Sequence, residues 1–316
     1  MAEIFFEGTE KKFEIVLKKG AAPLRGLGDR FWYTLVELAG ANVLSKLTGS
    51  LCNAYLLSES SLFVFDDRAV MITCGQTNLA LSLAELVKKI GVDEIQSVLY
   101  KRKNPNFPHL QISTFDEDRD YIRVHIPVRE HRFNSENGNY INLLCFENGP
   151  ALQEPAMTCE LLMHGIDPRR GRLFVGGYHK TRYDFYRETG MHELLPGFQC
   201  DDHFFEPSGY SVNALAGREF YTVHVTPEDP SPYVSFETNR LFTNTRGLRF
   251  LLRRMLSFFR PESFDVLLTG NSGVCRGPAM GAAHYRLFGE QTETISTRRD
   301  AVYRSYVRSP EQVSVV

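Results

Sequence analysis

Hydrophobic residues along the chain mostly form the short runs and alternations of strands, and only a few segments show helical spacing. Helices are predicted over 29–47, 78–90 and 248–259, and strands over 94–100, 157–166 and 264–269. A hairpin, a helix and a further strand recur in both halves of the chain. This order predicts an α+β fold, a four-layer α/β/β/α sandwich of two antiparallel sheets with outer helices, built from two similar halves.

The first predicted hairpin carries polar residues inside an apolar stretch. Residues 56–65 are predicted to form one buried strand, interrupted by the polar residues 58–61. Polar groups buried in such a strand need hydrogen-bond partners or serve chemistry. A loop is predicted at 66–68 and a returning strand at 69–73.

This hairpin places reactive side chains together. If Phe65 pairs with Ala69, Ser60 lies opposite Cys74, with Cβ atoms about 4.5–5.5 Å apart. A hydroxyl and a thiol then face each other beside the carboxylate of Glu59. We interpret this arrangement as a candidate reaction centre.

A second hairpin in the other half has a similar composition. The residues Gly217-Arg218 suit a two-residue type II′ turn, which prefers glycine first. The register that follows pairs Ser211 with His224. Two hairpins that each oppose a serine to a reactive side chain indicate a duplicated unit with one composite site, although a one-residue slip would turn the side chains to the other face.

Composition and charge exclude several classes of function. The 316 residues are 43% hydrophobic and 23% charged, with a net charge of −2, which gives no reason to expect a nucleic acid or an anionic membrane as partner. The first 19 residues lack a signal-peptide pattern, and no apolar run approaches the length of a membrane span. We therefore expect a cytoplasmic protein.

The six cysteines do not indicate a metal or redox motif. They are scattered without a Cys-x-x-Cys spacing, so they are predicted to be free thiols, buried as small apolar residues except for Cys74. His203, Glu206 and His224 match no known metal-ligand spacing, and no metal is expected.

Three charged segments are predicted to be exposed. The acids of residues 4–17 favour a solvated edge strand, 101–109 a solvated loop, and 116–120 a solvated face. Asn134 to Asn139 is predicted to be a turn-rich linker. Gly149-Pro150 marks the expected boundary between an N-terminal half, 1–150, and a C-terminal half, 151–316, of a single domain.

Several motifs in order resemble eukaryotic S-adenosylmethionine decarboxylase. They are the sequences FFEGTEK from Phe5, LSESS from Leu57, TCG from Thr73, GYS from Gly209, HVTPE from His224 and YVSFETN from Tyr233. The resemblance runs from residue 4 to about 240 and more weakly to the end, and residues 110–150 fit it poorly. Together the ordered motifs disfavour a β-rich binding module with structural serines.

The resemblance implies a proenzyme that cleaves itself. The bond corresponding to the family's cleavage site is Glu59–Ser60, which would give a β chain of residues 1–59 and an α chain of 60–316. Ser60 would become a covalently bound pyruvoyl group in place of pyridoxal phosphate. Ser211 matches the family's stabilising hydroxyl and His224 its processing base.

The resemblance also implies a reaction and a substrate. The pyruvoyl ketone would form a Schiff base with the amine of S-adenosylmethionine and draw off electrons as carbon dioxide leaves, yielding the aminopropyl donor for spermidine and spermine biosynthesis. Cys74 matches the proton donor. The residues matching the substrate pocket are Phe6 and Phe205 at the adenine, Glu228 at the ribose, and Leu57 and Glu59 lining it; Glu7 and Glu10 match acids of the family motif.

One departure concerns putrescine, which activates animal members through a buried acidic cluster. Glu14, Glu160 and Glu237 match three of its acids, but the fourth position holds Ala156. A dication that faces fewer carboxylates binds more weakly. We therefore expect weak or absent putrescine activation.

Two alternatives keep this resemblance but change the function. One is a catalytically inactive paralogue that acts as the allosteric partner of an active decarboxylase; the presence of Ser60, Cys74, Ser211 and His224 speaks against it. The other is a pyruvoyl decarboxylase of a plain amino acid such as ornithine or arginine, which the nucleoside-type residues disfavour. A homodimer and a monomer are both compatible with the resemblance.

Overall fold

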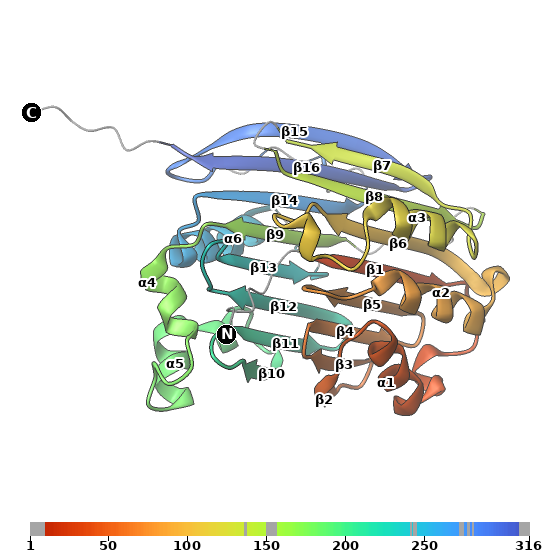
Figure 1. Cartoon of the computed structure of the whole chain (residues 1–316), viewed down its shortest axis with the longest axis horizontal. Helices are drawn as coiled ribbons and strands as arrows, with labels where there is room; N and C mark the ends of the chain where they lie inside the picture. Colours follow the sequence, from red (N-terminus) through yellow and green to blue (C-terminus); the bar gives the residue numbers. More distant parts are fainter. Residues whose placement is uncertain are drawn as a thin grey trace, which may run out of the picture.

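Two eight-stranded antiparallel sheets form the centre of the protein, as seen in a computed structural model (Figure 1). The structure describes residues 10–135, 138–149, 157–240, 242, 245–271, 275–276, 279 and 281–309. The strands of the first sheet, in spatial order, are β2 (Val43–Thr48), β3 (Cys52–Leu57), β4 (Ser60–Phe65), β5 (Arg68–Thr73), β1 (Lys11–Leu17), β6 (Ile95–Lys103), β8 (Tyr140–Glu147) and β7 (Arg129–Asn134).

The second sheet repeats this topology. Its strands, in spatial order, are β10 (Gln199–Phe204), β11 (Tyr210–Ala216), β12 (Glu219–Thr226), β13 (Tyr233–Thr238), β9 (Thr158–His164), β14 (Ser263–Gly270), β16 (Arg299–Arg308) and β15 (Tyr285–Ser296). Each strand thus corresponds to the strand eight places earlier in the chain. The division of the chain at residue 150 stays a prediction, since 150–156 lie outside the described residues.

Helices cover the outer face of each sheet. They are α1 (Asp29–Leu38), α2 (Leu79–Ile90) and α3 (Phe115–Arg123) in the first half, and α4 (Pro168–Gly171), α5 (Arg182–Thr189) and α6 (Thr245–Phe259) in the second. In Figure 1 the first three lie on the right and the others on the left. Trp32 and Leu83 of the helices belong to one buried apolar cluster with Leu62 and Val64 of the first sheet, and a similar cluster joins α5 and α6 to the second sheet. The predicted four-layer α/β/β/α sandwich is confirmed.

Two apolar clusters hold the sheets together. One joins Phe63 of β4 to Phe220 of β12, whose rings stack at 4.2 Å, and the other joins Phe133 of β7 to Tyr303 of β16. Charged residues also lie in the space between the two sheets. They include Lys12 of β1, Glu160 of β9 and Glu237 of β13. The interior is therefore not uniformly hydrophobic, and its polar groups need partners across the sheets.

Some predicted elements are wrong. The helix expected over 29–47 ends at Leu38, because Gly40 with φ +88° breaks it and Val43 begins strand β2. The run 56–65 is two strands, β3 and β4, joined by a turn at Ser58-Glu59. The predicted helices at 78–90 and 248–259 are confirmed by α2 and α6.

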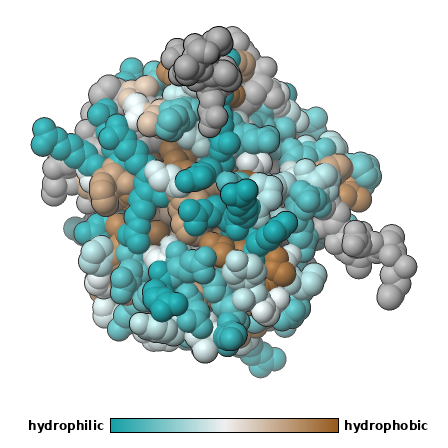
Figure 2. Space-filling view, turned by 90° about the vertical axis from the view of Figure 1, so that its left-hand side faces the viewer, coloured by the Kyte–Doolittle hydropathy of each residue, from teal (hydrophilic) through white to brown (hydrophobic). Residues whose placement is uncertain are grey.

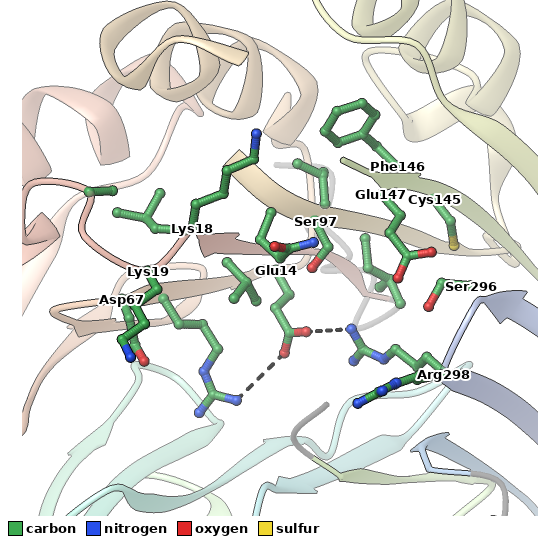
Figure 3. Close-up of a pocket in the computed structure, with 18 of the residues that line it drawn as sticks. Glu14, Lys18, Lys19, Asp67, Ser97, Cys145, Phe146, Glu147, Ser296 and Arg298 are labelled. Carbon is green, nitrogen blue, oxygen red and sulfur yellow. Dashed lines mark hydrogen bonds and ion pairs between the residues drawn. The ribbon is translucent and has the colours of Figure 1, made fainter. Parts of the chain in front are cut away.

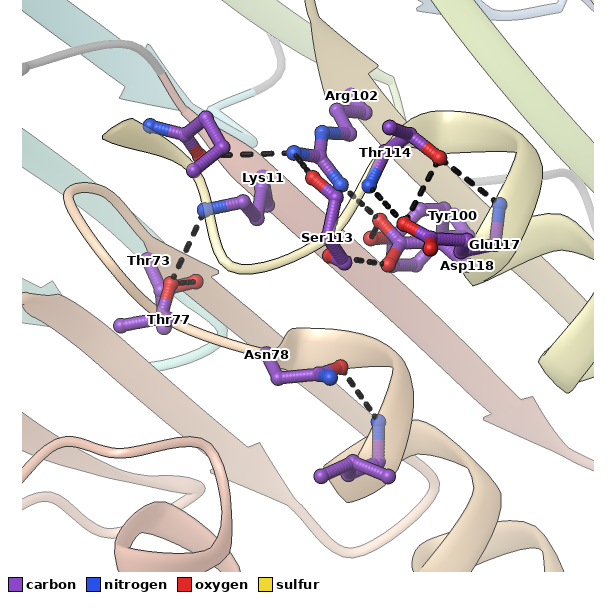
Figure 4. A network of polar contacts seen from close by, with 12 residues as sticks. Lys11, Thr73, Thr77, Asn78, Tyr100, Arg102, Ser113, Thr114, Glu117 and Asp118 are labelled. Carbon is purple, nitrogen blue, oxygen red and sulfur yellow. Dashed lines mark hydrogen bonds and ion pairs between the residues drawn. The ribbon is translucent and has the colours of Figure 1, made fainter. Parts of the chain in front are cut away.

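Charged segments expected in solvent are largely buried. Strand β1 lies between β5 and β6 in the middle of its sheet, and not at an edge. Residues Lys101 to Lys103 extend strand β6 and are buried, although a loop was expected. In helix α3, Asp118 is buried because it binds Arg102 and accepts a hydrogen bond from Tyr100 at 2.6 Å (Figure 4).

The outer surface is of the usual mixed kind. On the face where α4 and α5 lie, hydrophilic residues cover most of the area and hydrophobic ones show between them (Figure 2). Among the described residues, no helix is long and apolar enough to cross a membrane.

Candidate active site

The site is built around the turn between β3 and β4. Leu57 pairs with Ser60 across this turn, so Ser58 and Glu59 form a two-residue loop at the end of the hairpin. Leu57 is fully buried, whereas Glu59 remains partly exposed. The Glu59–Ser60 peptide bond therefore lies where the turn enters a buried strand.

Ser60 has an unusual backbone conformation. Its φ is +139°, a value that side-chain-bearing residues rarely adopt. Along β4, Leu62 and Val64 face the helices while Ser61 and Phe63 face the other sheet. Strand alternation would turn Ser60 toward the helices, yet its hydroxyl reaches His224 in the second sheet. Two successive serines thus point into the space between the sheets.

His224 lies at the centre of a cluster of hydroxyl groups. Its Nε2 is 2.9 Å from Ser60 Oγ and 2.8 Å from Thr222 Oγ1. Its Nδ1 is 2.8 Å from Ser211 Oγ. If Nδ1 carries the proton and donates it to Ser211, the Nε2 lone pair is free to accept the proton of Ser60.

Burial determines the protonation state of this histidine. Only 7% of His224 is exposed, and desolvation lowers its pKa to about 3. The imidazole is therefore neutral at physiological pH, which is the state that a general base requires.

The predicted pairing of Ser211 with His224 is confirmed, including the two-residue loop, in which Gly217 has φ +62°. The topological counterpart of this β11–β12 hairpin is β3–β4, whereas β4–β5 corresponds to β12–β13. The proposed equivalence between the two serine hairpins was therefore wrong by one strand.

The predicted register of the β4–β5 hairpin is wrong by one residue. Ser60 pairs with Thr73 and not with Cys74, because the loop contains only residues 66–67 and Arg68 begins the returning strand. Cys74 still lies at the turn. Its N–H donates to the carbonyl oxygen of Glu59 at 2.9 Å, and its thiol donates to the same oxygen at 3.1 Å. The carbonyl of the Glu59–Ser60 bond thus accepts two hydrogen bonds from one residue.

Glu59 and Cys74, the titratable groups beside this carbonyl, both have raised pKa values. Burial raises the pKa of Glu59 to about 7, although Lys11 partly opposes the shift. Burial, together with the charges of Glu59 and Glu10, raises the pKa of the Cys74 thiol well above its ordinary value. Cys74 therefore keeps its proton at neutral pH and is able to donate it.

Lys11 and two threonines fix the segment that follows Cys74 (Figure 4). Lys11 Nζ donates to the carbonyl oxygen of Gly75 at 2.9 Å, and Thr77 Oγ1 donates to Thr73 Oγ1 at 2.9 Å. These contacts tie the loop to strands β1 and β5 and so hold the thiol beside Glu59.

The structure describes only some of the residues that are expected to bind substrate. Phe205 and Glu228 are half-buried at the ends of β10 and β12, where Ser208 donates to Glu228 at 2.7 Å. The ring of Phe205 meets His203 edge-on at 4.9 Å. Phe6 and Glu7 lie outside the described residues, whereas Glu10 is buried with Lys101 3.6 Å away.

The expected acidic cluster is occupied by lysines. Lys12 Nζ lies 2.9 Å from Glu160 and 2.6 Å from Glu237, and Lys101 also pairs with Glu160. Burial opposes ionisation of Glu160, but Lys101 and Lys12 outweigh it and lower the pKa. Glu14 pairs with Arg299 at 2.6 Å and lies 3.8 Å from Arg68, and against the effect of burial the charges of Arg299, Arg68 and Lys12 lower its pKa. Ala156 lies outside the described residues.

Other residues of the site were missed from the sequence. Ser61 donates to Asn213 at 2.5 Å, and Asn213 donates to the Tyr55 carbonyl at 3.1 Å. Asn213 and Thr222 each lie two positions from a predicted site residue on the same strand, so the two-residue alternation was a signal for both. In the part of the chain that the structure describes, no group of three or more His, Cys, Asp or Glu residues is arranged to hold a metal, and the six cysteines are free.

The fold and the site together define a class of protein in which two similar sheets build one buried serine–histidine centre between them. Comparisons with known proteins narrow the class. The family model described as adenosylmethionine decarboxylase matches residues 3–306. The chain belongs to this family.

Relatives and a solved structure agree with the family. S-adenosylmethionine decarboxylase proenzymes of Dictyostelium discoideum and Xenopus laevis are each 32% identical to the chain; the matches cover 86% of it, and 77% and 85% of the respective relatives. A crystal structure of a Trypanosoma brucei AdoMetDC monomer matches with a TM-score of 0.60 at 22% identity, covering 79% of this chain and 99% of that one. That likeness concerns the fold.

Proposed function

We propose that the protein is a self-processing, pyruvoyl-dependent decarboxylase of S-adenosylmethionine that serves spermidine and spermine synthesis. The observation that carries this proposal is the contact of 2.9 Å between the Ser60 hydroxyl and a buried, neutral His224, next to a carbonyl held by Cys74. Family membership supports the choice of reaction.

Self-cleavage begins at Ser60. Its hydroxyl oxygen attacks the carbonyl carbon of Glu59 while His224 Nε2 takes the hydroxyl proton. The negative charge that develops on the Glu59 oxygen is stabilised by the N–H and S–H of Cys74, which already donate to it. The C–N bond then breaks, and the proton passes to the Ser60 nitrogen to give an ester and a free amine.

Elimination completes the processing. A base removes the Ser60 α-proton, the Cβ–O bond breaks, and residues 1–59 leave with a new carboxylate at Glu59. We assign the base to His224, with the Ser211 hydroxyl, 2.8 Å from Nδ1, fixing the ring. The dehydroalanine that remains tautomerises and takes up water, releasing ammonia and leaving a pyruvoyl group at the start of residues 60–316. The positive φ of Ser60 favours this sequence because cleavage relieves an unfavourable conformation.

The pyruvoyl group supplies the electron sink for decarboxylation without pyridoxal phosphate or a metal. The chain itself supplies a protonated thiol, Cys74, to deliver a proton to the substrate α-carbon after carbon dioxide has left. Phe205 and Phe6 are proposed to stack on the adenine, and Glu228 to bind the ribose hydroxyls. Leu57 and Glu59 would line the same pocket, and Glu7 and Glu10 would supply acids to it.

We further propose that putrescine activates this protein weakly or not at all. Two of the acids expected to bind the dication, Glu160 and Glu237, already hold the Lys12 ammonium at 2.9 Å and 2.6 Å. A bound lysine competes with an amine of the same charge for the same oxygens.

The proposed reaction is tested by release of labelled carbon dioxide. Carboxyl-labelled S-adenosylmethionine, ornithine and arginine are offered separately to the purified protein, with Ser60→Ala as the inactive control. Release from S-adenosylmethionine alone is expected. Release from ornithine or arginine instead would replace the substrate, and no release from any of them would favour an inactive partner subunit.

A further inference from the structure

A cavity of about 600 Å³ opens between the sheets, away from the site described above (Figure 3). It lies at the end of β1 where Val16 pairs with Arg68, whereas the opposite end of β1 pairs Lys11 with Thr73, beside Ser60. Strands of this length span roughly 17–20 Å. The cavity has the size of a small-molecule site but is separate from the Ser60 centre.

Arg68 lines this cavity with an unsatisfied guanidinium group. Only 6% of its side chain is exposed, and its N–H groups donate no hydrogen bond to any described residue. The nearest carboxylate oxygen, on Glu14, is 3.8 Å away, and the other close contact is the face of the Phe65 ring at 4.5 Å. An arginine keeps its charge, and its Nε is buried here without a hydrogen-bond partner among the described residues. A buried donor left unpaired is unfavourable unless something in the cavity accepts its hydrogen bond.

Further positive charge surrounds the same space. Arg299 donates to Glu14 at 2.6 Å and is a closer partner of that carboxylate than Arg68, which lies 3.8 Å away. Lys18, Lys19 and Arg298 lie around the opening in Figure 3, and none of them has an ion-pair partner among the described residues. The cavity lining holds six cationic side chains against five carboxylates, and one of these carboxylates, Glu219, pairs with Arg240 outside the lining.

Most acids of the cavity wall already have partners. Asp67 holds Arg218 at 2.8 Å, and Glu147 accepts hydrogen bonds from the backbone and hydroxyl of Thr297 at 2.9 Å and 2.8 Å. Of the three acids of the expected putrescine cluster, Glu14 lines the cavity but pairs with Arg299, whereas Glu160 and Glu237 do not line it. A cationic amine would meet Arg68 and the lysines and be repelled.

We propose that this cavity binds a small organic anion through a phosphate or carboxylate group. Two oxygens of the anion accept hydrogen bonds from the Arg68 guanidinium, the geometry that arginine offers to such groups. Lys18, Lys19 and Arg298 attract the ligand at the opening. This site does not depend on the proposed decarboxylation, and its occupant differs in charge from a polyamine.

Calorimetric titration with inorganic phosphate and with citrate tests the proposal on the purified protein, at constant ionic strength held with chloride. We expect saturable binding of at least one anion, weakened about tenfold or more in Arg68→Met, since a charged hydrogen-bond pair is lost. Arg187→Met is the matched control, because Arg187 is exposed on α5, away from the cavity, where it pairs with Asp184 and lies over the Tyr183 ring. It should bind as the unchanged protein does.

A second variant and a thermal unfolding measurement test the proposal independently of how well Arg68→Met folds. Arg298→Gln changes an exposed residue at the opening, so it should fold normally and still weaken binding. Thermal unfolding with and without phosphate should show stabilisation that Arg68→Met loses. Absence of saturable binding of either anion, or equal binding by folded Arg68→Met, would mean that the cavity holds only water. Neither readout requires catalytic activity, so failure here is separate from failure of the proposed reaction.

Discussion

At the scale of single residues, His224 is a buried base whose side-chain hydrogen-bond partners are neutral hydroxyl groups. It is buried, and it faces three hydroxyl groups that compete for Nε2, those of Ser60, Ser61 and Thr222. Burial keeps the ring neutral, while the hydroxyls satisfy its polar atoms without adding charge. The base is thereby ready at neutral pH without a carboxylate partner.

This burial predicts a characteristic dependence of stability on pH. The unfolded histidine takes up a proton near pH 6.5, whereas the folded one does so only near its pKa of about 3. Between these values the unfolded state binds more protons, so the free energy of unfolding falls as the pH is lowered from 6.5. The contribution is fully present above pH 6.5, and its loss by pH 4 is on the order of 3 kcal/mol.

Denaturant unfolding at several pH values measures this loss. The comparison uses Ser60→Ala with and without His224→Gln, so that neither chain cleaves itself. The loss attributable to His224 should be absent from the double variant, while adding His109→Gln to Ser60→Ala, which alters an exposed histidine, should change nothing. If the free energy of unfolding changed equally with pH in all three variants, the result would contradict a buried, neutral His224.

At the scale of elements, the strands that meet between the sheets were only partly predictable. The β11–β12 register followed from a glycine turn and from alternation, which are local signals. The predicted β4–β5 register was wrong by one residue because Arg68 was assigned to the loop. In the structure Arg68 begins strand β5 and is buried. Arg68 is buried because segments that are far apart in the sequence form the cavity wall around it.

The lysines of β1 and β6 illustrate the same limit. Lys101 was expected in a solvated loop and Lys12 in an edge strand, but both are buried because Glu160 and Glu237 of the second sheet neutralise them. A charged residue is buried only when its partner is in place. The partner is 59 positions away in the chain for Lys101, and 148 and 225 positions away for Lys12. Local sequence patterns carry no information about such pairs.

Lys12→Met should convert the cluster into a putrescine site. It removes the ammonium between Glu160 and Glu237, so the variant should be less stable and should gain thermal stability when putrescine is added. The unchanged protein should respond little. Lys46→Met, which alters an outer ion pair with Asp29, is the matched control. A several-fold rise in activity of the unchanged protein with putrescine would refute this interpretation.

At the scale of the whole molecule, the two sheets contribute different parts of one site. The first sheet supplies the Glu59–Ser60 bond and Cys74, and the second supplies Ser211 and His224. The repeated topology brings them together because corresponding strands face each other, with β3 packed on β11. The sequence alone predicted the two layers and the pairing of Ser211 with His224, but placing Ser60 against His224 required the packing of the sheets.

The central claim is that Ser60 attacks the bond that precedes it. Intact mass measured under denaturing conditions tests it most directly, with Ser60→Ala as the blocked variant and Ser61→Ala as the matched control, since both serines face His224. We predict two fragments from the unchanged protein and from Ser61→Ala, the larger beginning at residue 60 with a pyruvoyl group in place of a free amine. Ser60→Ala should stay whole. A single full-length mass for the unchanged protein after long incubation, or cleavage of Ser60→Ala, would contradict the claim.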